Sequence, residues 1–241
     1  MKKGSENVST GISGLDEVCK GGFRRGSSIL IAGAPGTGKS IFAMQFMYAA
    51  AKRKEATLFI SSEEPAESIR EYMSIWGKDA NKLEEDGLIT LIEQRIFGGK
   101  MISMEAPMTL IRKKKIKLLI LDSLTLFEYL YSPHVEEYRR GVLQFLFDLK
   151  EAGVTILATS ERHGTSLDAF PYKVDDSLFD AIVLLTKVRK GSSFERVLNV
   201  AKLRGKEHGL DIYPFTITKN GLSVFPKEIP FSLIEKDIKN G

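Results

Sequence analysis

The chain has 241 residues, of which 43% are hydrophobic and 27% are charged, and its 35 Lys and Arg residues exceed its 31 Asp and Glu residues by 4. This composition is that of an ordinary globular protein and excludes disorder, collagen and coiled coil as the main state, while the single cysteine, Cys19, excludes an intramolecular disulfide framework and a multi-cysteine zinc site. The net charge of +4 is too small to argue for nucleic-acid binding without a local basic patch.

Short apolar runs alternate with longer amphipathic stretches along the chain. The apolar runs predict strands, in chain order, at residues 27–32, 56–61, 88–92, 118–122, 154–159, 181–186 and 197–201. The stretches between them predict helices at residues 40–52, 65–76, 104–114 and 134–152, with Pro65 at the first helical position of the second. The first helix is apolar nearly all round, so we expect it to be buried. Near the end, Asn220-Gly221 between β-rich flanks predicts a two-residue hairpin turn.

Strands that are apolar throughout and alternate with helices are typical of a parallel sheet that is buried on both faces. We therefore predict an α/β fold, in which helices flank a largely parallel central sheet and antiparallel strands with a C-terminal β-hairpin extend one edge. No repeat or linker divides the sequence, so residues 1–241 are expected to form a single domain. Residues 1–9 are expected as an N-terminal arm and residues 226–241 as a C-terminal tail.

A phosphate-binding motif follows the first predicted strand. The sequence GAPGTGKS fits the pattern G-x-x-x-x-G-K-[ST] in full and lies between a predicted strand and a predicted helix. Glycines let the backbone curl so that successive N–H groups point at an anion, and the helix that follows adds the positive end of its dipole. Lys39 is expected to reach the β- and γ-phosphates, and the hydroxyl of Ser40 is a hard ligand for Mg²⁺. The predicted nucleotide site comprises Gly33, Ala34, Pro35, Gly36, Thr37, Gly38, Lys39, Ser40 and Ile41.

Asp122 closes the apolar run KLLILD. In an open parallel sheet the carboxyl ends of the strands face the ligand crevice, so Asp122 is expected beside the phosphate loop, where it would hold Mg²⁺ through water. Taken alone, a cap or turn aspartate is the more ordinary interpretation, and the phosphate loop favours the metal site. Thr159 and Ser160 end another strand at this edge, where a hydroxyl either senses the γ-phosphate or caps the following turn.

Two adjacent acids, Glu63 and Glu64, directly follow a predicted strand and so belong to the same edge. Hydrolysis needs one group that orients and deprotonates water, and adjacent residues on an extended segment point to opposite sides. One glutamate is therefore expected to face the γ-phosphate while the other supports it. Two solvated acids at the start of a helix, where the dipole favours them, explain the pattern equally well.

Several of these residues together resemble a known family. The stretch TGISGLD at residues 10–16, the pair Gly21-Gly22, the phosphate loop, the Glu63-Glu64 pair and Asp122 are similar to the corresponding parts of KaiC-type domains in the RecA/RadA superfamily. The late element KLRGKEH, residues 202–208, matches that family's K-x-R-G-x-x-H pattern and is more specific than the phosphate loop. The likeness runs from about residue 8 to residue 225, which is nearly the whole chain.

The resemblance implies a RecA-like P-loop NTPase core that uses ATP and Mg²⁺, in a homo-oligomeric ring, usually of six subunits, with nucleotide at the subunit interfaces. It favours Glu63 as the residue that activates water, with Glu64 as its partner. It assigns Lys202 and Arg204 to the neighbouring subunit's γ-phosphate and puts His208 near the nucleotide. An inserted arginine makes physical sense there, because the transition state spreads negative charge over the equatorial oxygens. Without the resemblance, a solvated pair on an edge strand and a surface histidine are the simpler interpretations.

The chain also departs from that family. KaiC proper carries two such domains in tandem, whereas one is found here, and its second domain bears a Ser-Thr pair that is phosphorylated. The comparable stretch before Asp180 has the sequence DDSLF, with no hydroxyl pair. An autokinase cycle and a clock role are therefore not expected.

Weaker patterns concern DNA and the core. The run Lys113, Lys114, Lys115 and Lys117 favours a solvated helix end over a DNA footprint, and residues 161–176 balance Arg162 and Lys173 with four acids, which argues against DNA binding. Trp76, Phe145 and Phe147 are expected in the core.

We thus predict a KaiC-like, ring-forming Mg²⁺-dependent ATPase, slow or under the control of a regulatory protein partner. A recombinase-like DNA-binding ATPase and a nucleotide-gated scaffold with little hydrolysis stay open as alternatives. No stretch is long enough to span a bilayer and the polar N-terminus lacks a signal sequence, so a cytoplasmic protein without a membrane partner is expected.

Overall fold

The structure is a computed structural model of the whole chain, and it describes residues 7–93, 105–125, 135–162 and 173–233. Most of the predicted N-terminal arm, half of the predicted C-terminal tail and most of residues 161–176 lie outside these ranges, as do the first residues of the helices predicted at 104 and 134. No helix in the described ranges is long and apolar enough to cross a membrane.

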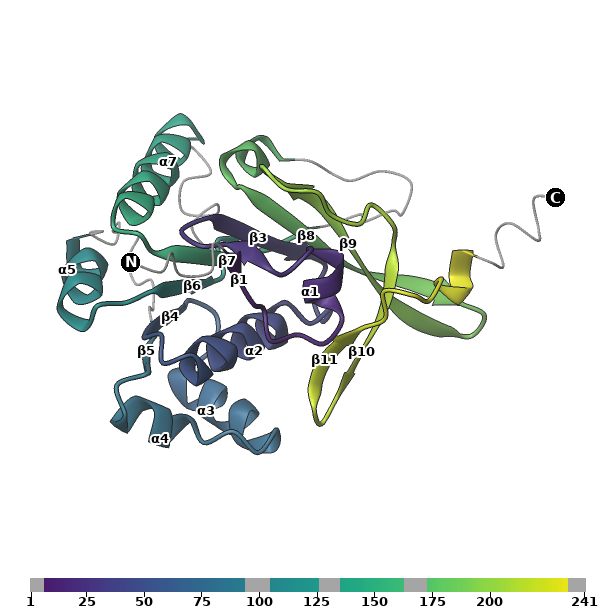
Figure 1. Cartoon of the computed structure of the whole chain (residues 1–241), viewed down its shortest axis with the longest axis horizontal. Helices are drawn as coiled ribbons and strands as arrows, with labels where there is room; N and C mark the ends of the chain where they lie inside the picture. The colour runs from purple at the N-terminus through teal and green to yellow at the C-terminus, as the bar shows by residue number, and fades with distance from the viewer. Residues whose placement is uncertain (1–6, 94–104, 126–134, 163–172, 234–241) are drawn as a thin grey trace.

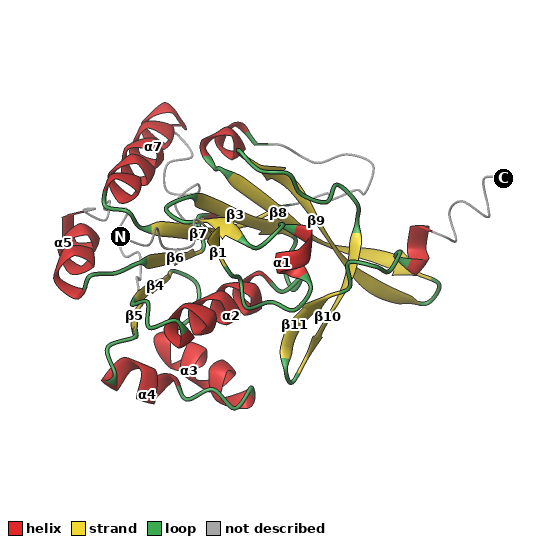
Figure 2. Cartoon of the chain, viewed as in Figure 1, coloured by secondary structure: helices red, strands yellow, loops and turns green. Residues whose placement is uncertain are grey.

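One nine-stranded sheet organises the protein, and its strands run in the order β11-β10-β9-β8-β3-β7-β6-β4-β5 (Figure 2). The strands from β5 to β8 are parallel to one another, whereas β9, β10 and β11 pair with antiparallel neighbours at one edge. This arrangement confirms the predicted α/β fold with antiparallel additions. The strands are β3 (Ser28–Gly33), β4 (Thr57–Ser61), β5 (Ile89–Glu93), β6 (Leu118–Asp122), β7 (Thr155–Glu161), β8 (Ala181–Lys190), β9 (Ser193–Leu203), β10 (Tyr213–Thr218) and β11 (Gly221–Val224).

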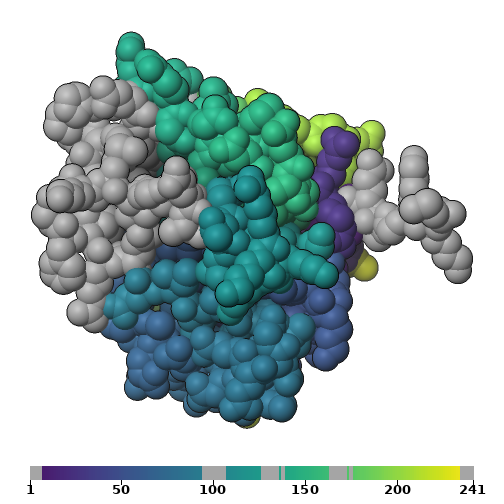
Figure 3. Space-filling model, turned by 90° about the vertical axis from the view of Figure 1, so that its left-hand side faces the viewer, coloured from purple at the N-terminus to yellow at the C-terminus, as the bar shows by residue number. Residues whose placement is uncertain are grey.

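Helices cover both faces of the sheet (Figure 1). On one face lie α1 (Leu15–Val18), α2 (Lys39–Lys52), α3 (Ala66–Ile75) and α4 (Ala80–Glu85); on the other lie α5 (Glu105–Lys114) and α7 (Val135–Glu151). Seen from the end of the molecule, α5 lies between α7 and the α3–α4 pair (Figure 3). Alternate residues of β3 divide between the two layers: Ile29 and Ile31 join the core under α2, and Leu30 and Ala32 join the core under α5 and α7. The apolar runs therefore arise because each strand is buried on both faces.

Helix α2 is the central element of the larger core. Eight of its side chains are buried, including Phe42 and Phe46, which have no exposed surface, so the predicted burial is confirmed. The ring of Phe46 meets that of Phe23 edge to face, with 6.1 Å between centroids. Because α2 begins at the phosphate loop, this packing fixes the position of the loop's far end.

The TGISGLD stretch has a structural role beside α2. A Cβ atom at Gly11 would lie 2.3 Å from Cβ of Ala49, and one at Gly14 would lie 2.1 Å from the carbonyl oxygen of Val224, so neither position accepts a side chain. The carboxylate of Asp16 accepts hydrogen bonds from the backbone and hydroxyl of Thr10, at 2.9 and 2.8 Å. These contacts join the N-terminal segment to α2 and β11.

Four details differ from the sequence predictions. Pro65 is the N-cap of α3 and not its first helical residue, because its ψ of 148° is extended. The hairpin turn consists of Lys219 and Asn220, and Gly221 begins β11 at a φ of 96°. Phe147 is 56% exposed, since it lies on the face of α7 opposite the buried Leu149. Both β8 and β9 extend well beyond their predicted ends into a long hairpin whose outer part is exposed.

Some elements were not predicted at all. The two-residue strands β1 (Asn7–Val8) and β2 (Phe23–Arg24) pair with each other, so part of the predicted arm is a strand. The short helices α1 and α4 and the 3₁₀ helix η1 (Val174–Leu178) were also missed. Each is too short to produce a periodic apolar pattern.

Two phenylalanines provide a test of the core assignment. Phe46→Ala should lower the free energy of unfolding by about 3–5 kcal/mol, because it removes a fully buried ring and leaves a cavity. Phe147→Ala, the matched control at an exposed position, should change it by less than about 0.5 kcal/mol. Urea denaturation measures both, and equal losses in the two variants would contradict the assigned layers.

Candidate functional site

The carboxyl ends of β3, β4, β6 and β7 meet at one edge of the sheet, where the chain leaves each strand for a loop. The phosphate loop, residues 33–40, runs from the end of β3 into α2. Asp122 is the last residue of β6, and Glu161 is the last residue of β7. Glu63 follows β4 by two residues. The predicted phosphate, metal and water-activating residues therefore lie at the same edge.

The phosphate loop has the backbone that its glycines predict. Gly36 and Gly38 have φ values of 72° and 112°, in the left-handed region that side chains rarely adopt. A Cβ at Gly33 would lie 2.3 Å from the carbonyl oxygen of Leu185, so β8 closes against the loop's first residue. The hydroxyl of Thr37 donates to the Ala34 carbonyl at 2.8 Å, which closes the turn. The loop is thus an ordered turn that ends at the N-terminus of a 14-residue helix.

Lys39 lies inside the site and is only 8% exposed. Its ammonium group donates to the Ala34 carbonyl at 3.3 Å. Burial lowers the pKa of Lys39, and the carboxylates of Glu161, Asp122 and Glu63 act in the opposite direction. The ammonium group of Lys39 therefore contacts the phosphate loop and lies near three carboxylates.

Asp122 is 7% exposed, and its carboxylate accepts hydrogen bonds from the hydroxyls of Thr159 and Ser40. Burial raises the pKa of Asp122, against the effect of these two hydrogen bonds, and the nearby charge of Glu63 raises it further. Ser40 and Asp122 thus offer two adjacent hard oxygen atoms. Thr159, for which sequence left two roles open, bonds to the acid.

This donor set suits Mg²⁺. The described ranges contain no group of three or more His, Cys, Asp or Glu side chains that could enclose a metal ion. Magnesium is bound by one or two protein oxygens and takes its remaining ligands from phosphates and water, so Ser40 and Asp122 fit it without such an enclosure.

Hydrogen bonds between β4 and β6 fix the position of Glu63. The backbone N–H of Ser62 donates to the Asp122 carbonyl at 2.7 Å, and the backbone N–H of Ser123 donates to the Ser62 hydroxyl at 2.9 Å. The Ser123 hydroxyl then donates to the carboxylate of Glu63. For Glu64, the hydrogen bonds in the described ranges involve only its backbone, which bonds to the Ser61 hydroxyl. Both glutamates are exposed, and they differ in their side-chain contacts: the carboxylate of Glu63 is bonded to Ser123 and its charge acts on Asp122, whereas Glu64 is held through its backbone.

Sequence reasoning missed Ser123 and Glu161 as parts of this site. Glu161 is the acid with the largest electrostatic effect on Lys39. Its backbone N–H donates to the Thr125 hydroxyl at 2.8 Å. The signal was available, because Glu161 follows a predicted strand at the carboxyl edge by two residues, as Glu63 does. It was instead counted among the charges of the loop that follows.

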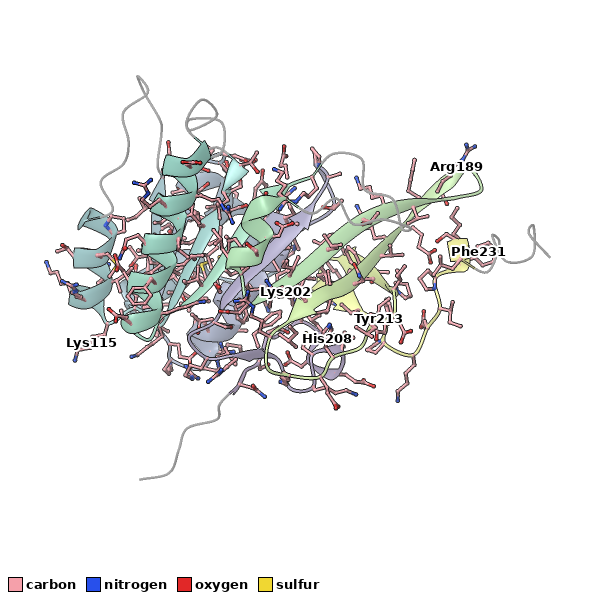
Figure 4. The ribbon with its side chains drawn as sticks, turned by 90° about the horizontal axis from the view of Figure 1, so that it is seen from above. Lys115, Arg189, Lys202, His208, Tyr213 and Phe231 are labelled. Carbon is pink, nitrogen blue, oxygen red and sulfur yellow. The ribbon has the colours of Figure 1, made fainter. Side chains whose placement is uncertain are left out.

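Lys202, Arg204 and His208 do not lie at this edge. Lys202 is paired with Ile182, which is paired with Leu30 near the start of β3, whereas the phosphate loop follows the other end of β3. The backbone N–H of Arg204 donates to the carbonyl of Asp180 at 2.8 Å, one residue before β8 begins. Figure 4 shows Lys202 and His208 near one end of β9, with Arg189 at the opposite end of the β8–β9 hairpin. Measured along β3, Lys202 lies level with Leu30, about 10 Å from Gly33, and Arg204 lies near the level of Ser28, about 16 Å from Gly33.

Two cations of the late element, Lys202 and Arg204, reach the short helix η1. Lys202 donates to the carbonyls of Asp176 and Ser177 at 3.2 and 3.3 Å, and Arg204 donates to the Ser177 carbonyl at 2.9 Å. Arg204 also lies 3.6 Å from the carboxylate of Asp180. Arg204 is the first residue after β9, so the two cations do not lie on one strand, although both side chains donate to the Ser177 carbonyl.

His208 lies in the loop after these cations and is half-buried. Its Nε2 atom is buried and forms no hydrogen bond within the described ranges. The next residue, Gly209, is held to α1 by a 3.0 Å hydrogen bond from its N–H to the Val18 carbonyl.

Comparison with known proteins agrees with this geometry. The family model described as "ATPase: KaiC" matches residues 8–229. The chain belongs to the KaiC family of ATPases. It is 33% identical over 235 residues to the circadian clock oscillator protein KaiC of Parathermosynechococcus lividus. The aligned region covers 93% of this chain and 43% of that protein. It is 32% identical over 235 residues to circadian clock oscillator protein KaiC 1 of Synechocystis sp. strain PCC 6803, covering 93% of this chain and 45% of that protein.

The chain spans less than half the length of the curated KaiC relatives it matches. The matched region includes the phosphate loop, both glutamates, Asp122 and the late basic element. The nine-stranded sheet agrees with the RecA-like P-loop fold that the resemblance implied.

The buried acid gives a test in the nucleotide-free protein. Asp122→Asn should raise the urea midpoint near neutral pH, because it removes a charge whose burial raises the pKa of Asp122 in the folded state. A carboxyl group whose pKa is higher in the folded state destabilises the fold above that pKa, and the penalty disappears as the pH falls and the group is protonated. The difference between variant and wild type should therefore narrow towards low pH.

The matched control is Asp86→Asn, which changes an exposed carboxylate and should show no such pH-dependent gain. A lower midpoint for Asp122→Asn than for wild type at pH 8 would contradict the assigned environment of the acid.

Proposed function

We propose that this chain is a ring-forming, Mg²⁺-dependent ATPase whose active sites are each completed by an adjoining copy of the same chain. The observation that carries the proposal is the separation of the two halves of the site within one subunit. Lys39, Ser40, Asp122 and Glu63 lie together at one end of the sheet, and the late cations lie at the other. One subunit therefore cannot bring Arg204 to its own phosphate loop without refolding.

Within one subunit, the loop amides and Lys39 bind the β- and γ-phosphates of ATP, while Ser40 and Asp122 hold Mg²⁺. When bound, the metal ion neutralises charge on the phosphate oxygens. Glu63 orients the attacking water and accepts its proton, and Ser123 fixes the carboxylate for this task. Glu64 supports Glu63 from the next position, and Ile41 lines the site beside Ser40.

From the adjoining subunit, Lys202 and Arg204 reach the γ-phosphate, and His208 lies near the nucleotide. Arg204 supplies a planar fork for the equatorial oxygens and Lys202 supplies a point charge. Arg204 is 55% exposed, so its guanidinium can be offered to a second molecule. The ring contains six subunits, by analogy with the family, and the protein is cytoplasmic.

The biological role we propose is regulatory, through a protein partner that senses the nucleotide state of the ring. Relatives of about twice this length are named as circadian clock oscillator proteins. The stretch before Asp180 has two acids and a single serine where the family's second domain has a hydroxyl pair. A self-phosphorylating clock cycle is therefore not part of the proposal.

Native mass measurement with and without Mg-ATP, followed by analysis of the products, tests the proposal as a whole. We expect a cyclic oligomer in the presence of Mg-ATP and slow release of ADP and phosphate. A species that stays monomeric at saturating ATP yet hydrolyses it at full rate would contradict the proposal. Hydrolysis that depends on single-stranded DNA would favour a recombinase-like ATPase instead.

Two substitutions separate binding from turnover. Lys39→Ala should abolish nucleotide binding, because it removes the cation of the phosphate loop. Glu63→Gln should keep ATP binding but lower turnover by about 10²–10⁴-fold, the usual contribution of a general base. Glu71→Gln, at an exposed position of α3, is the matched control and should leave both unchanged. Wild-type turnover by Glu63→Gln would remove Glu63 from its role.

Mixed rings test whether the cations act on the neighbouring site. Arg204→Ala alone should lower turnover by about 10³-fold or more. Mixing Arg204→Ala subunits with Glu63→Gln subunits should restore part of the activity, because some interfaces then combine an intact Glu63 with an intact Arg204.

Mixing Lys39→Ala with Glu63→Gln subunits is the matched control for this recovery. Both changes damage the nucleotide half of the site, so no interface regains a complete set of residues. The absence of recovery with Arg204→Ala, in rings that native mass shows to be mixed, would argue against delivery between subunits.

A further inference from the structure

An ion pair that is fully buried joins β7 to η1. The guanidinium of Arg162 bonds to the carboxylate of Asp176, and both side chains are 2% exposed. Arg162 directly follows β7, and Asp176 lies in the middle of η1. Charged side chains are rarely buried to this degree unless they are paired, and a buried pair costs desolvation energy on both sides. Because a buried ion pair adds little to the stability of a fold, the presence of this pair points to another role.

On one side, Arg162 is attached to the nucleotide half of the site. Its backbone N–H donates to the carbonyl of Gly33, the first residue of the phosphate loop, at 3.2 Å. Its guanidinium also donates to the Ser160 hydroxyl at 2.7 Å. Arg162 is thus fixed to the carboxyl ends of β3 and β7.

On the other side, Asp176 belongs to η1, the short helix whose backbone carbonyls bind Lys202 and Arg204. The carbonyl oxygens of Asp176 and Ser177 accept the hydrogen bonds from Lys202 and Arg204. The second carboxylate oxygen of Asp176 accepts from the backbone N–H of Lys173 at 2.8 Å, so the carboxylate also shapes η1 itself. The position of η1 therefore determines where the two carbonyl groups lie that orient Lys202 and Arg204.

We propose that Arg162 and Asp176 are a positioning pair, which holds η1 at a fixed place relative to the subunit's own phosphate loop and thereby aims Lys202 and Arg204 at the adjoining subunit. This inference rests on the proposed function, because it assumes that the two cations complete a second copy's site. The pair touches no substrate and acts only through η1. A defect in the pair should therefore slow hydrolysis at the adjoining subunit's site, which receives Lys202 and Arg204. The subunit's own nucleotide site should keep its residues in place, although Arg162 is bonded to its phosphate loop.

Asp176→Asn is the direct test. It should lower kcat about 10–100-fold, the size of loss that a small misplacement of a catalytic group causes, while KM and the affinity for ATP stay within about twofold of wild type. Glu84→Gln is the matched control, because it breaks the Arg70–Glu84 ion pair between α3 and α4, far from η1. Its kcat should be unchanged.

A mixed ring shows on which side of the interface the defect lies. Asp176→Asn subunits keep an intact nucleotide half, so mixing them with Glu63→Gln subunits, whose cations are intact, should restore activity. If these mixtures fail to recover while mixtures of Arg204→Ala and Glu63→Gln do recover, the pair serves its own nucleotide site and the inference is overturned. If the Arg204→Ala mixtures also fail, the error lies in the proposed function.

A variant that lacks both cations tests the pair independently of which subunit is served. When Lys202 and Arg204 are both already alanine, Asp176→Asn should cause little further loss of kcat, since a residue that acts through these two cations has nothing left to position. If Asp176→Asn lowers the remaining kcat by the same factor as it lowers the wild-type kcat, the inference is overturned.

In Asp176→Asn the guanidinium of Arg162 loses its buried carboxylate partner, which can impair folding. If it does, the double variant Arg162→Met/Asp176→Leu is used in its place. Apolar replacement of a buried ion pair is often neutral or stabilising, so this double variant should fold and bind ATP. It should nevertheless show the same 10–100-fold loss of kcat. A well-folded ring with wild-type kcat would show that the pair is merely structural.

Discussion

The alignment of strand ends is the constraint on which the rest of this protein depends. Four parallel strands finish at one edge, and each delivers a polar residue to the same small volume. Before any ligand binds, that volume holds the ammonium of Lys39 against the carboxylates of Asp122, Glu63 and Glu161. Such an excess of negative charge would repel a triphosphate that carries no metal ion, and a divalent cation between the acids and the phosphates would offset that repulsion. This charge arrangement supports our proposal that the nucleotide binds together with Mg²⁺.

The same sheet also separates Lys202 and Arg204 from the phosphate loop of their own subunit. Antiparallel pairing of β8 with β9 returns the chain to the amino ends of the parallel strands before Lys202 and Arg204 appear. There they are held by backbone carbonyls and by one carboxylate, that of Asp180, which also pairs with Lys150 at 2.7 Å. Hydrogen bonds within the subunit thus orient these side chains in advance, which would lower the entropic cost of completing the neighbouring site that we propose.

The features that were predicted from the sequence are those that residues close together in the chain determine. Doubly buried strands give apolar runs, and the phosphate loop gives its glycines, so both were found in the sequence together with Asp122. Elements fixed by tertiary contacts were missed: β1 and β2 exist only because they pair with each other, and the exposure of Phe147 depends on how α7 sits on the sheet. The bonds of Ser123 to Glu63 and of Arg162 to Asp176 join residues 60 and 14 positions apart, and no spacing rule connects them.

The separation of Lys39 from Arg204 also sets the direction of the assembly that we propose. Each subunit would offer its cations from one surface and its phosphate loop from another, so association through them would be head-to-tail. A linear string of such subunits always carries one unfinished pocket at its first member and one unused pair of cations at its last. Closing the string into a circle removes both defects at once. Opening a single contact in that circle would silence only one pocket, which offers a partner protein a way to adjust output in discrete steps.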